Sequence, residues 1–242
     1  EMQNLKRISE YNLTDNPIPH YFPHDSRFLS LLGKFSFRLE DLIVFHSFVY
    51  HTYNINLKEI QKIADNTPQY NPDLLDDEEH EMALISQARH RERVGYYDDL
   101  NRKASFFAND SVVINLWAII EQFSTMAYSL LEAIIKEIPE NQVKVPYTWD
   151  KLKKKYLSYG IDLSQLDSYD VINETRVLNN KIKHLYIVDE NLASFPFFKD
   201  KENKSLLGME YRLQDYVIGT HKFIGHLLED CSIKLGNKAN MI

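Results

Sequence analysis

Three polar side chains recur at intervals of four residues in the C-terminal half of the chain. Arg176, Asn180 and His184 lie in the segment 169–189, which reads YDVINETRVLNNKIKHLYIVD. Residues four apart on an α-helix stack along one line, so this spacing places a guanidinium, an amide and an imidazole on one face. Such groups bind a phosphate, orient it and move a proton. The alternative interpretation is a solvated helix face whose Arg and His have structural roles only.

The rest of this segment has the periodicity of an amphipathic helix. Its narrow apolar stripe consists of Val171, Leu178, Ile182 and Leu185. Asn173 and Lys183 lie opposite the stripe, beside the three residues with potential chemistry. We therefore expect one helix over 169–189 with a polar, functional face.

The elements that must position this helix are also predicted to be helical. Only 7 Gly and 8 Pro interrupt the 242 residues, and the long segments between them have helical spacing of apolar residues. The sequence predicts an all-α bundle of about seven helices, with an irregular segment or short β-hairpin at 191–208. The expected helices cover 25–53, 57–65, 73–103, 110–139, 149–159, 169–189 and 209–235. We expect residues 1–104 to form a helical extension packed on a bundle made by residues 105–242.

Composition limits the class of protein and its partners. A hydrophobic content of 44% and a charged content of 26% are typical of a globular chain. The single Cys231 cannot form an internal disulfide and fits a reducing compartment. Because no apolar run approaches the roughly 20 residues of a membrane span, we expect a soluble, cytoplasmic protein.

Charge is segregated along the chain. The net charge of −7 argues against broad, non-specific binding of nucleic acid. However, residues 144–188 hold eight basic and five acidic residues, a balance of +3, and include the helix of interest. Lys153, Lys154 and Lys155 lie in this basic part, where they either contact a phosphate backbone or are solvated.

One acidic residue interrupts the most apolar helix. Glu121 lies between Ile120 and Phe123 in the helix expected at 110–139. If Glu121 is buried it needs a partner, and Arg176 or His184 is the natural one. If it faces outward, it is an ordinary solvated acid. No Cys/His zinc pattern is present, and Asp77 and His80, spaced as in di-metal carboxylate bundles, have no second such pair on another helix. No metal or other cofactor is therefore expected.

The segment 173–184, NETRVLNNKIKH, preceded by GIDLSQLDSYDVI at 160–172, resembles the signature helix of HEPN domains. The resemblance is to the branch found in bacterial abortive-infection and toxin-like proteins, and it covers residues 110–235. That family has an R-x(4–6)-H motif on a late helix. Asn180 and His184 match its NxxxH half. Asn179 stands where the motif has Arg, and Arg176 lies one turn earlier on the same face.

The resemblance implies metal-independent RNA cleavage at a composite site between the motif helices of a homodimer. The chemistry of the residues is consistent with this reaction: His184 serves as general acid or base, Arg176 stabilises charge on the phosphate by its place on the same face, and Asn180 orients His184 or the phosphate. Supporting roles fall to Glu121, Asn179 and Lys183, and contacts with the RNA backbone to Lys153, Lys154 and Lys155. The implied biology is a defence or toxin effector, with an antitoxin or regulatory protein as a further partner.

Two other functions are compatible with the same residues. The first is a non-catalytic member of the fold that dimerises, binds a nucleotide or docks a partner, which the Asn at position 179 favours. The second is a helical structural or antitoxin-like protein that does not bind nucleic acid.

Overall fold

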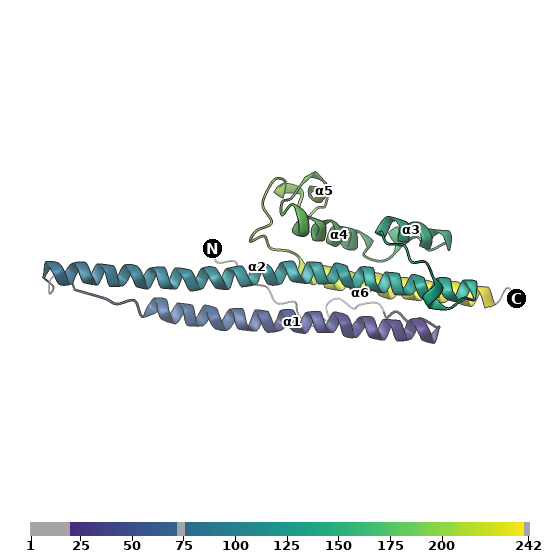
Figure 1. The fold of residues 1–242 in the computed structure, drawn as a ribbon, viewed down its shortest axis with the longest axis horizontal. Helices are drawn as coiled ribbons and strands as arrows, with labels where there is room; N and C mark the ends of the chain where they lie inside the picture. The colour runs from purple at the N-terminus through teal and green to yellow at the C-terminus, as the bar shows by residue number, and fades with distance from the viewer. Residues whose placement is uncertain (1–19, 72–75, 240–242) are drawn as a thin grey trace.

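Two long antiparallel helices dominate the computed structural model, which describes residues 20–71 and 76–239 (Figure 1). α1 spans Ser26–Asp65 and α2 spans Asp77–Lys136, 40 and 60 residues respectively. α2 begins with a capping box in which Asp76 and Glu79 exchange side-chain and backbone hydrogen bonds.

Both long helices continue through positions where the sequence analysis placed breaks. The predicted gaps at 54–56 and 104–109 contain neither Pro nor Gly, so nothing in the backbone ends the helix there. Asp110, predicted as a helix cap, instead lies inside α2. Its carboxylate accepts hydrogen bonds from Tyr186 at 2.5 Å and Tyr211 at 2.9 Å. The described residues therefore form six α-helices, not the seven predicted, and the all-α class is confirmed.

The shorter elements follow α2 in sequence. α3 spans Trp149–Ser158 and ends before Gly160, whose φ of +80° favours glycine. α4 spans Tyr169–His184, α5 spans Glu190–Ala193 and α6 spans Leu213–Ala239. Three 3-10 turns connect them, at Glu140–Gln142, Leu163–Gln165 and Lys199–Lys201.

Two details of the C-terminal half differ from the sequence expectation. α4 ends at His184, before the predicted end at 189, because Tyr186 adopts a left-handed φ of 52° that leaves the helix. The predicted β-hairpin is reduced to one isolated bridge between Ile187 and Ser205. No strand is present in residues 20–71 or 76–239.

α2 and α6 lie alongside each other between two layers. α1 lies on one side of them and α3, α4 and α5 lie on the other (Figure 1). One hydrophobic core joins these layers, with completely buried members such as Phe35, Leu116, Leu178 and Phe223. The ranges 1–104 and 105–242 therefore share this core and one uninterrupted helix, α2.

α2 is apolar enough to resemble a membrane span. One 18-residue window of this helix has a mean hydropathy of 1.2, and 56% of that window is buried inside the protein. It is the one described helix that passes a test of length and composition for crossing a membrane. Packing at the centre of a helical bundle accounts for such a composition.

Candidate functional site

The apolar side of α4 fixes which of its residues face solvent. Ile172, Val177 and Leu178 are buried where α4 packs on α2 and α6. Leu185, the last residue of the predicted apolar stripe, lies beyond the helix and is 59% exposed. The opposite side of the helix carries the residues singled out by their spacing.

These residues form an outward-facing row, here called the α4 ridge: Asn173, Arg176, Asn180, Lys183 and His184. The Arg176 guanidinium donates to Oδ1 of Asn173 from Nε at 3.2 Å and from Nη2 at 2.9 Å. Asn180, Lys183 and His184 are exposed. Arg176, Lys183 and His184 form no ion pair with any described residue. The predicted polar face thus exists and is open to solvent.

The N-terminal end of the ridge is joined to α3. Nζ of Lys153 donates to the hydroxyl of Tyr169 at 2.5 Å and lies 4.8 Å from the centre of its ring. Lys154 and Lys155 are exposed on α3 and point to other sides of that short helix. Of the three lysines predicted to contact RNA, the structure therefore places only Lys153 in contact with α4.

Asn179 does not belong to the ridge. Its side chain is 1% exposed, and its Oδ1 has no hydrogen-bond partner among the described residues. Its Nδ2 donates to Oδ1 of Asn180 at 3.3 Å. The position that holds Arg in the HEPN-type motif thus points into the protein, where Asn179 contacts the ridge through Asn180.

Glu121 lies apart from the ridge. It is exposed, and it lines a surface cavity between α2 and the start of α3 together with Tyr147 and Trp149. It forms no ion pair with Arg176 or His184, so of its two predicted environments the structure shows the exposed one.

The buried acid of this region is Glu174, which the sequence analysis missed. It is 1% exposed, and its carboxylate accepts hydrogen bonds from Arg212 Nε at 2.9 Å and from the Tyr216 hydroxyl at 2.6 Å. The sequence did indicate that Glu174 is buried, because it is four residues before Leu178 and so lies on the same side of the helix. Arg212 and Tyr216 are themselves four apart, which lets both reach one carboxylate from the start of α6.

The distance between Arg176 and His184 along the helix determines whether one copy of the ridge can bind a phosphate with both. Arg176 and His184 are eight residues apart, which corresponds to about 12 Å along the helix axis. The bonds to Asn173 draw the guanidinium toward the N-terminus of α4, away from His184. One copy of the ridge therefore does not bring both side chains to one phosphate.

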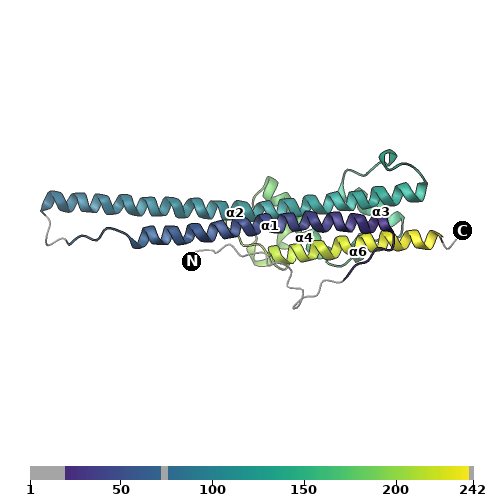
Figure 2. The same ribbon diagram turned by 90° about the horizontal axis from the view of Figure 1, so that it is seen from below.

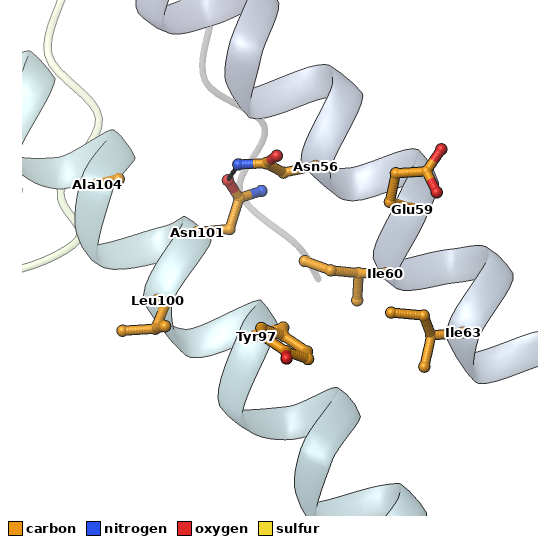
Figure 3. Close-up of a pocket in the computed structure, with 8 residues that line it drawn as sticks. All are labelled: Asn56, Glu59, Ile60, Ile63, Tyr97, Leu100, Asn101 and Ala104. Carbon is orange, nitrogen blue, oxygen red and sulfur yellow. Dashed lines mark hydrogen bonds between the residues drawn. The ribbon is translucent and has the colours of Figure 1, made fainter.

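A second cavity lies far along the α1–α2 pair. It has a volume of about 350 Å³, and mainly apolar side chains such as Ile60, Ile63 and Leu100 line it (Figure 3). Asn56 donates to Oδ1 of Asn101 at 3.3 Å at one end of this cavity. No residue of α4 contributes to it.

The described residues contain no metal centre, and no similar protein was found. Within residues 20–71 and 76–239, no group of three or more His, Cys, Asp and Glu side chains is arranged to hold a metal ion. Comparison with protein families, curated proteins and solved structures found no match to this chain. The function of the protein therefore has to be inferred from its own residues.

Proposed function

We propose that this protein is an RNA-binding, metal-independent endoribonuclease whose active groups lie on the α4 ridge. The observation that supports it is the outward-facing row of half-buried Arg176 and exposed Asn180 and His184, in which Arg176 and His184 form no ion pair with a described carboxylate. An unneutralised guanidinium and ammonium on one face attract a phosphate backbone. The imidazole at the end of the row is a side chain that can both accept and donate a proton.

The complete site requires two copies. Arg176 and His184 are equally distant in sequence from Asn180. If two ridges meet antiparallel with a two-fold axis at Asn180, Arg176 of one copy lies opposite His184 of the other. RNA between the ridges neutralises their facing cations, so RNA itself favours this apposition.

Each composite site then has the groups needed for RNA transesterification. His184 of one copy removes the proton of the 2′-hydroxyl, and the 2′-oxygen attacks the adjacent phosphorus. The bond from phosphorus to the 5′-oxygen breaks, and water protonates the departing oxygen. Arg176 of the other copy stabilises the charge on the phosphate. The products are a 2′,3′-cyclic phosphate and a 5′-hydroxyl, and the imidazolium returns its proton to solvent.

The test is incubation of the purified protein with end-labelled single-stranded RNA in EDTA. Cleavage persists in EDTA, produces cyclic-phosphate ends and is absent with a 2′-deoxy substrate. His184→Ala and Arg176→Ala each lower the rate about 100-fold. The matched controls His80→Ala and Arg91→Ala change exposed residues of α2 and keep full activity. Full activity in His184→Ala would contradict the proposal.

Mixing the two inactive variants tests the composite site. When Arg176→Ala and His184→Ala chains are mixed, half of the random ridge-to-ridge pairs contain both types. Each such pair has one intact site and one doubly altered site, so about a quarter of the wild-type activity returns. A site contained in one copy gives no recovery.

A second candidate function is RNA binding without cleavage. It is favoured by His184, whose ring has no hydrogen bond to a described residue that would fix its tautomer, and by the buried amide at Asn179. Under this alternative the protein binds RNA in EDTA without forming products, and Arg176→Ala weakens binding while His184→Ala does not. Under either function we propose RNA as the partner and the cytoplasm as the location. The HEPN-like segment supports a defence or toxin effector.

A further inference from the structure

The outer face of α1 carries an apolar stripe that nothing described covers. Phe37, Val44, Phe48 and Ile55 are 72%, 61%, 69% and 47% exposed. Their spacings of seven, four and seven residues place them on one straight line along the helix. In Figure 2, α1 lies in front of α2 and α6, with no labelled helix over its outer face. We call these four residues the α1 stripe.

The α1 stripe is not part of the core of its own chain. The core residues of α1, among them Phe28, Phe35 and Leu39, are on the opposite side of the helix. A surface helix normally has charged and polar residues on that outer side. The four side chains expose on the order of 400 Å² of apolar surface, about half of what one partner buries in a standard interface.

We propose that the α1 stripe is a self-association surface through which two copies of this chain pair antiparallel. The stripe is symmetric about position 46, so residues whose numbers sum to 92 face each other across a two-fold axis. Phe37 of one copy then packs on Ile55 of the other, and Val44 packs on Phe48. Such an interface is isologous, since each contact occurs twice.

The charges beside the stripe match this arrangement. Lys34 and Glu59 lie on one flank of the stripe, and their numbers sum to 93, so each faces the other residue of the second copy. Glu40 and His51 lie on the opposite flank with a sum of 91. All four are exposed. Within one chain Glu59 pairs with Lys62 at 2.6 Å, an exposed contact of the kind that contributes little and that Glu59 can exchange.

This surface is distinct from the α4 ridge. α1 and α4 lie on opposite sides of α2 and α6 (Figure 1), so pairing through α1 leaves both ridges facing outward. In the absence of RNA the cationic ridges repel each other, and α1 alone accounts for association. Self-association through α1 can therefore be tested independently of the proposed ribonuclease function.

Sedimentation velocity of the full chain without RNA, over a range of concentrations, tests the surface. Wild type sediments as a dimer, and Phe48→Glu as a monomer with an unchanged helical circular dichroism spectrum. The matched control Leu157→Glu replaces a side chain on α3 that is 58% exposed and stays dimeric. A wild type that is monomeric throughout, or a dimer that survives Phe48→Glu, overturns the proposal.

Charge reversal tests the antiparallel register. Lys34→Glu and Glu59→Lys each place like charges opposite each other and weaken the dimer about 5-fold or more. The double variant Lys34→Glu/Glu59→Lys restores opposite charges and returns the dimer to near the wild-type affinity. Failure of the double variant to recover rules out this pairing. Cleavage assays on the same variants report on the ridge, and their outcome does not depend on the dimer.

Discussion

Glu174 and Arg212 form an ion pair between the middle of α4 and the turn before α6, with Arg212 Nε 2.9 Å from the carboxylate of Glu174. The Tyr216 hydroxyl donates to the same carboxylate at 2.6 Å. Because Glu174 is on the buried side of α4, this contact fixes the rotation of the helix about its axis. It thereby turns the α4 ridge toward solvent.

Removing that carboxylate destabilises the protein strongly. Glu174→Ala leaves the partly buried Arg212 and the buried Tyr216 without their acceptor, and we expect a loss of about 3 kcal/mol or more in the free energy of unfolding. Urea unfolding followed by circular dichroism measures it. Lys183→Ala, on the exposed side of the same helix, stays within about 0.5 kcal/mol of wild type. Equal losses in the two variants would show that Glu174 does not anchor α4.

The stability of the protein depends on pH through Glu132. Burial of this carboxyl opposes its ionisation, but hydrogen bonds from Lys136, Tyr128 and Tyr159 outweigh burial and lower its pKa from 4.5 to about 2. A carboxyl whose pKa is lowered by folding stabilises the native state above its unfolded pKa, and that stabilisation disappears as the pH falls through the folded pKa.

We therefore expect the contribution of Glu132 to be complete above about pH 4.5 and to be lost between about pH 4.5 and pH 2. Its size is roughly 3 kcal/mol. Unfolding free energies measured across this range fall less steeply in Glu132→Gln than in wild type. Parallel curves for the two proteins would contradict the assignment.

Helical periodicity was sufficient to predict the class of the fold and the polar face of α4. These features depend on local sequence, because apolar residues that recur at helical spacing must be buried together. The joins between helices were less predictable. α2 continues past Asp110 because Tyr186 and Tyr211, both distant in sequence, occupy the carboxylate that would otherwise cap a helix.

Individual side chains at the candidate site depended on tertiary packing. Glu174 has the composition of a solvated helix residue and is buried, whereas Glu121 interrupts an apolar sequence and is exposed. The burial of Glu174 depends on the neighbouring segment, because Arg212, just before α6, and Tyr216, in α6, both donate hydrogen bonds to its carboxylate. Asn179 and Asn180 show the same limit, because these adjacent identical residues differ in burial: Asn179 is buried and Asn180 is exposed.

Placing an arginine at position 179, where the HEPN-type motif has one, is expected to destabilise the protein. Asn179→Arg places a cation where the present side chain is 1% exposed, and we expect a loss of about 3 kcal/mol or more in stability because no described acid is paired with that position. Thermal unfolding measures the loss. His184→Arg adds the same side chain at an exposed position of the ridge and leaves stability nearly unchanged. A stable Asn179→Arg protein with increased cleavage would show that the motif can be completed in place.

If the ridge binds RNA as proposed, the salt dependence of binding identifies which of its cations contact phosphates. For single-stranded RNA the logarithm of the binding constant falls with the logarithm of salt concentration, with a slope near −0.7 per phosphate contact. Lys183→Ala and Arg176→Ala each remove one cation from the α4 ridge, so each makes the slope shallower by about 0.7. Fluorescence anisotropy with a labelled RNA over a series of salt concentrations gives the slopes. Lys103→Ala, which removes an exposed lysine paired with Asp99 at 2.6 Å on α2, keeps the wild-type slope. If Lys183→Ala and Arg176→Ala also keep the wild-type slope, the ridge does not contact the phosphate backbone, and its arginine and lysine are solvated residues.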